Sequence, residues 1–280
     1  MAVEYLSARE VKLAELRLLD AFDSYCRENG LRYSLAYGTL LGAVRHKGFI
    51  PWDDDVDVVM PADDYRRFCA EFPGHSETDA SRITIASRFN FRGADAIPFE
   101  KLVDPNIAVK SGHIESSIRE FVWLDIFPVA SFPSEGEGRK IIEAVTRYKH
   151  LYQASRWSSS QPGPVGLLKA FAGCVARRTP LQQWSLKKMV GLLEDCTFAS
   201  GGYVANIGWP VYGQRELVPG GLFDDLVEYT FEGKQYYGFR DFDCYLSSIY
   251  GDYMTLPPVN KRVSHELKAW YVGNPDGLMG

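Results

Sequence analysis

The sequence predicts an α+β fold in which a mixed sheet is covered by helices and followed by a helical insertion. In the first half, apolar strand-like runs alternate with amphipathic helical patterns. From Arg139 to about Cys196 the pattern is helical, and a hairpin and a helix follow. The chain has 280 residues, 46% of them hydrophobic, so it can bury a large core. We expect one domain, with a core over 1–135, a basic helical segment over 136–200 and a C-terminal hairpin and helix segment over 201–280.

The chain is expected to open with an amphipathic helix and a short strand. Ser7-x-x-Glu10 has the form of a capping box, and apolar residues at helical spacing continue through Cys26 to a stop near Gly30. Residues 33–37 then predict a strand.

A turn, a short helix and a second strand come next. Gly38-Thr39 predicts a tight turn with a capping hydroxyl, and residues 40–45 predict a short helix. Residues 55–60 predict the strand, and Pro61 suits the first turn of another helix.

The remaining elements are predicted in the same way. Further strands are expected over residues 83–89, 97–103 and 121–129. Residues 227–239 predict a hairpin that turns at Glu232-Gly233, and residues 242–250 predict a helix that ends at Gly251.

Composition and charge exclude several classes of protein. The net charge of −5 and the pI near 5.6 are not those of a nucleic-acid-binding protein, so no nucleic acid partner is expected. The N-terminus lacks a signal-peptide pattern, and the longest apolar stretch, Val165 to Ala176, is shorter than the roughly 20 residues of a membrane span. The five scattered cysteines are expected as buried thiols, so we predict a cytoplasmic protein.

The most informative segment is the acidic run that ends in Asp55-Val56-Asp57. Side chains alternate faces along a strand, so Asp55 and Asp57 are expected to point the same way and Val56 the other way. Two adjacent carboxylates repel each other unless a cation lies between them, and hard oxygen ligands favour Mg²⁺ or Mn²⁺. The alternative is a solvated acidic turn or a loose Ca²⁺ loop.

A third carboxylate favours the metal site. Asp125 is the single charge in a very apolar run, where burial without a partner is unfavourable. From a neighbouring strand it would complete a ligand set with Asp55 and Asp57, so these three are the predicted metal-binding and catalytic residues. Asp53 and Asp54 are expected as outer-shell or capping residues.

A phosphate-binding turn is predicted just before the acidic run. Gly38-Thr39 leads into a helix N-terminus, where free backbone N–H groups and the helix dipole suit a phosphate. Phosphoryl transfer needs such a cradle beside a metal. Arg45, His46 and Lys47 end this helix and are candidates to bind donor phosphates; alternatively they are favourable charges at a helix C-terminus.

With these residues in place, the sequence resembles the LicD family. The family signature is close to residues 37–57, from Tyr-Gly-Thr-Leu-Leu-Gly to Trp-Asp-Asp-Asp-Val-Asp. Two further segments also resemble the family, residues 123–128 and residues 249–258, the latter followed by Lys261, Arg262 and His265.

The resemblance implies a fold and a reaction. The fold would be of the nucleotidyltransferase type, distantly like the DNA polymerase beta catalytic domain. The reaction would transfer phosphocholine, or a related polyol phosphate, from CDP-choline or a similar CDP-linked donor to a glycan or a lipid-linked sugar acceptor. Asp55 and Asp57 resemble the family's metal pair, Asp125 resembles its third acid, and Gly38 with Thr39 occupies the place of a Gly-Ser phosphate turn.

Basic residues elsewhere are further donor-binding candidates. Lys261, Arg262 and His265 are expected to close over the donor diphosphate, because Arg and Lys suit phosphate oxygens; the alternative is a solvated basic turn. Lys101 lies in a predicted strand and is a candidate to face the site. Trp52 and Trp123 could stack on the base, although apolar packing is the simpler role.

The predicted chemistry is in-line attack of an acceptor hydroxyl on the β-phosphorus of the donor, with CMP leaving. Asp125 is a candidate to take the proton of that hydroxyl. One alternative keeps the fold but transfers the nucleoside monophosphate itself. Another is a non-catalytic module that binds phosphorylated glycans, although a pure binder has no need of three carboxylates beside a phosphate turn.

The stretch from Arg139 to Gly191 differs in charge from the rest of the chain. It holds ten Lys or Arg and a single acid, Glu143. We predict that it meets an anionic partner, such as a lipid-linked phosphorylated acceptor or the inner face of the membrane. The alternative is a core-packed helical subdomain with a basic outer face.

Overall fold

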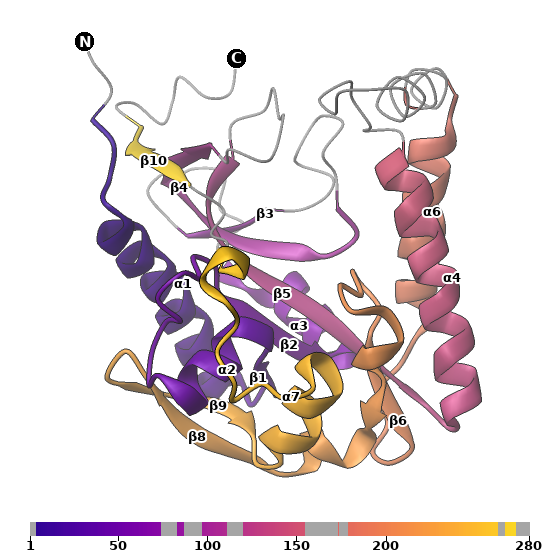
Figure 1. Cartoon of the computed structure of the whole chain (residues 1–280). Helices are drawn as coiled ribbons and strands as arrows, with labels where there is room; N and C mark the ends of the chain where they lie inside the picture. The colour runs from indigo at the N-terminus through magenta and orange to yellow at the C-terminus, as the bar shows by residue number, and fades with distance from the viewer. Residues whose placement is uncertain are drawn as a thin grey trace.

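The fold is built around a curled mixed sheet that crosses the middle of the molecule (Figure 1). The computed structural model describes residues 4–73, 83–86, 97–110, 120–154, 173, 179–262 and 267–272. The strands of this sheet are β1 (Ser34–Leu35), β2 (Asp57–Pro61), β3 (Thr84–Ala86), β4 (Glu100–Lys110), β5 (Glu120–Phe132), β6 (Tyr203–Asn206), β7 (Val218–Pro219) and β10 (Lys268–Tyr271).

The order of the strands makes β5 the central one. The main path runs β1-β2-β5-β4-β10, with β3 also paired to β4 and with β6 joined to β5 and β7. Strands β2 and β5 are parallel, whereas every other pairing in the described sheet is antiparallel. The predicted α+β class with a mixed sheet is therefore confirmed.

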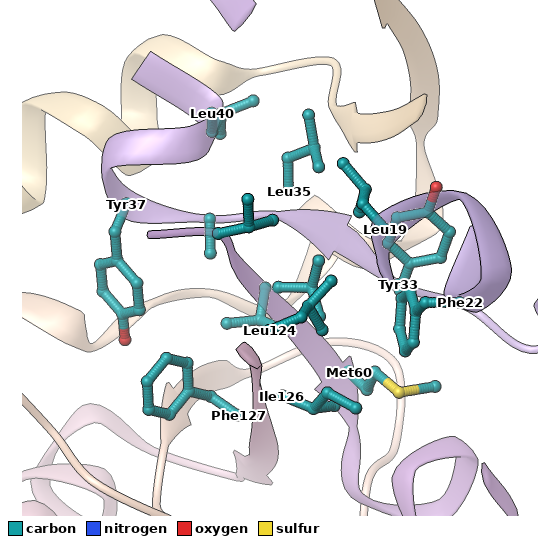
Figure 2. Packing of buried hydrophobic residues seen from close by; sticks show 14 of the residues in the cluster. Leu19, Phe22, Tyr33, Leu35, Tyr37, Leu40, Met60, Leu124, Ile126 and Phe127 are labelled. Carbon is teal, nitrogen blue, oxygen red and sulfur yellow. The ribbon is translucent and has the colours of Figure 1, made fainter. Parts of the chain in front are cut away.

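One face of the sheet is covered by α1 (Ala8–Asn29) and α3 (Ala62–Glu71), which pack against β5. Helix α1 begins at the predicted capping box, in which the Ser7 and Glu10 side chains each accept a hydrogen bond from the other residue's backbone N–H. Alternation along β5 directs Leu124 and Ile126 into this core, with Leu19 and Phe22 of α1 nearby (Figure 2).

On the other face of β5, Phe127 meets the start of α2 (Tyr37–Arg45). The rings of Tyr37 and Phe127 have their centroids 5.6 Å apart and are nearly perpendicular, as Figure 2 shows. Helix α2 also contacts α7 (Phe242–Tyr250). The acidic site lies on this face.

The predicted hairpin forms a separate two-stranded sheet, with β8 (Leu226–Phe231) and β9 (Lys234–Phe239). It turns at Glu232 and Gly233, which both have positive φ, as a tight two-residue turn requires. Three short 3₁₀ helices complete the described elements: η2 (Gly213–Glu216), η3 (Gly220–Asp224) and η4 (Val259–Lys261).

Helices α4 (Glu135–Ala154) and α6 (Leu181–Asp195) pack side by side at one edge of the molecule (Figure 1). Val145, Tyr152 and Met189 form a small core between them. Residues 158–164, whose Ser, Gly and Pro content predicts a connecting loop, lie outside the described residues. In the part of the chain that is described, no helix combines the length and the apolar character that crossing a membrane requires.

Two boundaries near the site differ from the prediction. Strand β2 begins at Asp57 rather than Asp55, because the chain is still turning before it: the Asp53 N–H donates to the Ile50 carbonyl. Helix α2 begins at Tyr37, so Thr39 lies inside its first turn and does not cap it.

The predicted bounds of strand β4 also lie too early in the sequence. The prediction covered residues 97–103, whereas the strand spans Glu100–Lys110. Its second half is held by pairing with β10 and with the start of β5, contacts that a local pattern does not contain. Of the strand predicted over residues 83–89, the described part holds β3, and residues 87–89 lie outside it.

Candidate active site

Three charged side chains form a row across adjacent strands of the sheet. Asp57 on β2 is the register partner of Asp125 on β5, and Asp125 is the partner of Lys101 on β4. Partners in register share a face, so the three side chains point the same way. The Lys101 Nζ lies 2.9 Å from the Asp125 Oδ1. The structure thus places Lys101 at the site together with two of the three predicted acids.

The electrostatics of the row are dominated by negative charge. Burial raises the pKa of Asp57 well above its usual range, and the carboxylates of Asp55, Asp125 and Asp53 raise it further. The ammonium group of Lys101 opposes them. A cation, or a proton, at Asp57 is therefore strongly favoured.

Asp55 and Asp53 approach this row from the turn that precedes β2, and both are half-buried. The Asp53 carboxylate lies against Gly38 in the first turn of α2, and a Cβ at Gly38 would overlap the Asp53 Oδ2. Glycine is therefore required at position 38 for this close approach.

Thr39 connects the helix directly to the acidic strand. Its side chain is buried, and its Oγ1 accepts a hydrogen bond of 2.9 Å from the Asp57 N–H. The predicted phosphate turn is thus the first turn of α2. There the hydroxyl of Thr39 positions Asp57. A phosphate bound at this turn would therefore be held by the backbone of the turn and not by the Thr39 hydroxyl.

The three basic residues at the end of α2 take different places. The Arg45 Nη1 donates to the Tyr253 carbonyl at 2.5 Å, and burial lowers the pKa of Arg45. Burial, followed by the charge of Arg45, lowers the pKa of His46. Lys47 is exposed, and its carbonyl accepts a hydrogen bond from the Glu232 N–H of the hairpin.

The C-terminal segment reaches the acidic run through Arg262. Its guanidinium lies over the Trp52 ring, 4.6 Å from the centroid, and its Nε donates to the Pro257 carbonyl. Trp52 immediately precedes Asp53, so Arg262 lies at the rim of the site. The side chain of Lys261 and the whole of His265 are outside the described residues.

Comparison with known proteins identifies the family of this site. The model of the LicD/FKTN/FKRP nucleotidyltransferase domain matches residues 30–131, which include Gly38, Lys101 and the acidic residues 53–57 and 125. The chain carries a LicD-family domain. The resemblance noted in the sequence is therefore confirmed.

Similarity to one relative extends beyond this LicD domain. The lipopolysaccharide cholinephosphotransferase LicD of Haemophilus influenzae is 28% identical over 279 residues, 95% of this chain and 98% of the relative. Two uncharacterized Rickettsia proteins match short stretches: one from R. typhi is 36% identical over 23% of this chain and 21% of its own length, and one from R. prowazekii is 51% identical over 13% and 14%. The prediction of a LicD-type transferase enzyme is confirmed.

A fourth acidic element approaches the LicD site from outside the matched residues. Glu15 of α1 is 2% exposed, and its Oε2 has no hydrogen-bond partner among the described residues. Burial raises its pKa well above the usual range, and Asp55 and Asp54 raise it further. A sequence signal existed, because Glu15 lies in line with Val11, Leu18 and Phe22 on the apolar stripe of the helix.

Two tyrosines of the C-terminal half lie on the opposite side of Asp57. The Tyr212 and Tyr250 hydroxyls are hydrogen-bonded at 3.3 Å. Burial raises the pKa of both phenols, and the Asp57 carboxylate adds to each shift. No local pattern marks Tyr212, because it lies in a loop that reaches the site only through the fold.

Proposed function

We propose that this protein transfers phosphocholine, or a related polyol phosphate, from a CDP-linked donor to a sugar hydroxyl of a cell-surface glycan or its lipid-linked precursor, in a metal-dependent reaction. The name of the Haemophilus relative supports phosphocholine as the group and a lipopolysaccharide-type acceptor. We also infer a nucleotidyltransferase-type fold, which is supported by the description of the domain model and by the position of α2 beside the acidic strand.

The observation that carries the proposal is a buried indole N–H without a hydrogen-bond partner among the described residues, next to the ion pair of Lys101 and Asp125 in the floor of the site. Within the described part of the chain, neither the Asp125 Oδ1 nor the Trp123 Nε1 makes a hydrogen bond, although the Oδ1 is ion-paired with Lys101. The Lys101 Nζ also lies 4.3 Å from the centroid of the Trp123 ring. A buried polar atom is rarely left unpaired, so the Trp123 N–H beside an ammonium group and a carboxylate indicates a polar ligand.

The residues present fit a divalent cation by their chemistry. Carboxylate oxygens are the ligands that Mg²⁺ and Mn²⁺ prefer, and burial, followed by three neighbouring carboxylates, raises the pKa of Asp57. Among the described residues, no group of three or more Asp, Glu, His or Cys side chains lies close enough together to hold an ion. Binding at Asp55, Asp57 and Asp125 therefore requires their side chains to close together. A bound cation would neutralise charge that develops on the diphosphate.

Two residues of the row and Arg262 then have defined tasks in the transfer. Asp125 takes the proton from the acceptor hydroxyl as its oxygen bonds to the β-phosphorus and the bond to CMP breaks. Lys101 holds Asp125 and supplies positive charge beside the transferred phosphate. Arg262 lies at the rim, where its planar guanidinium suits the donor diphosphate.

The test is release of CMP by the purified protein. CDP-choline, CDP-ribitol and CDP-glycerol are each incubated with Mg²⁺, with and without a lipopolysaccharide-derived acceptor. We expect CMP to be released with CDP-choline and acceptor, to stop after chelation of the metal, and to resume with Mg²⁺ or Mn²⁺. Release of free phosphocholine with a nucleotidylated acceptor would instead establish nucleotidyl transfer, and binding without turnover would leave a binding module.

A variant of the site floor makes this test specific. Trp123→Phe removes the unsatisfied indole N–H but keeps an aromatic ring, so we expect a raised KM for the donor, by roughly 10-fold for one lost hydrogen bond to a charged group. Trp184→Phe, at an exposed position on α6, is the matched control and should leave the KM for the donor unchanged. Equal behaviour of the two variants would contradict the assignment of Trp123 to the donor site.

A further inference from the structure

A buried polar cluster lies directly behind the first turn of α2. The Tyr37 hydroxyl donates to the Glu216 Oε2 at 2.5 Å and accepts a hydrogen bond from the Asn206 Nδ2 at 2.9 Å. The Tyr212 N–H donates to the Glu216 Oε1 at 2.6 Å. Glu216 and Asn206 are each 3% exposed. Both come from beyond residue 131, where the matched LicD domain ends.

This arrangement suits an ionised carboxylate. Both oxygens of Glu216 accept hydrogen bonds, one from the Tyr37 hydroxyl and one from the Tyr212 N–H. A proton on one oxygen would face the fixed Tyr212 N–H donor, and a proton on the other would force the Tyr37 hydroxyl to change from donor to acceptor. Burial nevertheless raises the pKa of Glu216 to about 7, opposed by the hydrogen bonds from Tyr37 and Tyr212 and by the charge of Lys149. The network therefore lies close to its own protonation point at neutral pH.

Tyr37 connects this cluster to the active site. It is the first residue of α2 and has a φ of 43°, a left-handed conformation that non-glycine residues seldom adopt. Tertiary contacts must hold it, and these are its hydroxyl bonds and its packing against Phe127 (Figure 2). Gly38 and Thr39 follow at once, the first against Asp53 and the second bonded to the Asp57 N–H.

We propose that Glu216 is a positioning residue, which acts through the Tyr37 hydroxyl to hold the first turn of α2 against Asp53 and Asp57 and does so only when ionised. The expected fall in turnover rests on the proposed function, whereas the expected change in amide exchange of the Asp57 N–H does not. The other titratable groups that face Glu216 are Lys149 of α4, Tyr245 of α7 and the two tyrosines that bond to it.

Opposite pH dependences of activity and stability follow from this arrangement. Turnover falls as the pH drops through about 7, because protonation of Glu216 removes the charge-assisted hydrogen bond that it accepts from Tyr37. The folded chain holds the Glu216 proton more tightly than the unfolded chain does. The contribution of Glu216 to stability is therefore fully present below its ordinary pKa of 4.5 and is lost as the pH rises through about 7.

The experiment compares Tyr37→Phe and Glu216→Gln with a matched control. The control is Tyr236→Phe. The Tyr236 hydroxyl donates to the Asp20 carboxylate at 2.7 Å, so this variant loses the same type of hydrogen bond at a position outside the cluster. Amide exchange of the Asp57 N–H is followed by NMR or mass spectrometry, and kcat is measured from pH 6 to 8. We expect exchange about tenfold faster and kcat about tenfold lower at pH 8 in the two cluster variants only.

Two further results are expected. Glu216→Gln should abolish the fall in kcat below pH 7, and the double variant should be no worse than either single variant, since both remove one interaction. Unchanged Asp57 exchange in both cluster variants would overturn the inference. If the unmodified protein transfers nothing, the proposed function fails, and the exchange comparison still decides whether Glu216 positions α2.

Discussion

At the scale of single residues, the carboxylates of the acidic run act on two different buried groups, Asp57 and Glu15. The carboxylates that raise the pKa of Asp57 are those of Asp55, Asp125 and Asp53. Asp54 adds, together with Asp55 and Asp53, to the shift of the buried Glu15 behind the run, and Asp54 is not among the main causes of the shift of Asp57. The run is therefore not a uniform patch of charge, and neutralising its members one at a time should have unequal effects.

The first prediction compares Asp55→Asn and Asp57→Asn with Asp54→Asn. The first two should each lower turnover roughly 100-fold or more, the scale of losing one preorganised electrostatic contact in a site, whereas Asp54→Asn should cost far less. Without metal, Asp57→Asn should unfold at a higher temperature than the unmodified protein, because it removes a buried carboxylate that its neighbours repel. Kinetics and thermal denaturation measure both effects.

Metal titration supplies the control for this comparison. Mg²⁺ should raise the melting temperature of the unmodified protein and of Asp54→Asn, because only the folded site binds the ion. It should not raise that of Asp55→Asn or Asp57→Asn. If Asp54→Asn lost the Mg²⁺ response and the activity as fully as the other two, the assignment of Asp55 and Asp57 would be wrong.

At the scale of elements, the start of α2 joins three parts of the site. Gly38 lies against the Asp53 carboxylate, Thr39 is bonded to the Asp57 N–H, and Tyr37 is held from behind by Glu216. The helix has no side-chain cap of its own. Its N-terminal geometry is thus set by contacts with residues distant in the sequence.

The second prediction concerns Gly38→Ala, with Gly191→Ala as its control. The new Cβ overlaps the Asp53 Oδ2, the movable end of a side chain, so Asp53 should turn away at little cost to stability. We expect kcat to fall about 10- to 100-fold, as small misplacements in active sites do. Gly191 lies in α6 with nothing within 4 Å of a new Cβ, so alanine there should add about 0.5–1 kcal/mol of stability and leave activity unchanged.

A Gly38→Ala protein that retained full activity would show that Asp53 need not lie against α2. A large loss of stability would show instead that the backbone, and not the Asp53 side chain, limits the space. Both outcomes are read from one activity assay and one urea denaturation curve.

At the scale of the whole molecule, the pair α4 and α6 lies to one side of the sheet (Figure 1). Not all its basic residues face outward: Lys149 is buried and donates to the Pro210 carbonyl. Lys187 and Lys188 of α6 are exposed, as is Trp184, at 44%. Exposed lysines beside an exposed tryptophan are a combination that membrane interfaces favour.

The third prediction is salt-sensitive binding of the chain to anionic liposomes. Reversing Lys187 and Lys188 to Glu should weaken binding, since each lysine near such a surface contributes about 1 kcal/mol. Reversal of the exposed pair Lys110 and Lys268, register partners on β4 and β10, is the control and should have a smaller effect. Sedimentation at low and high salt measures both, and absence of binding at low salt would remove the membrane hypothesis.

The sequence by itself determined the features that depend on neighbours along the chain. The capping box at Ser7 and Glu10 and the turn at Glu232 and Gly233 form as predicted, because a few adjacent residues satisfy their own hydrogen bonds and backbone angles. The acidic run was also visible in the sequence, but strand alternation does not extend to Asp55, because β2 begins at Asp57.

Tertiary structure decided which charges meet. The ion pair of Lys101 with Asp125 depends on the register of β4 with β5, and the buried position of Glu216 depends on how η2 packs. Thr39 changed from a predicted cap to a partner of Asp57 for the same reason. These contacts join residues far apart in the chain, and strand register and burial are set by the core as a whole, so local patterns do not contain them.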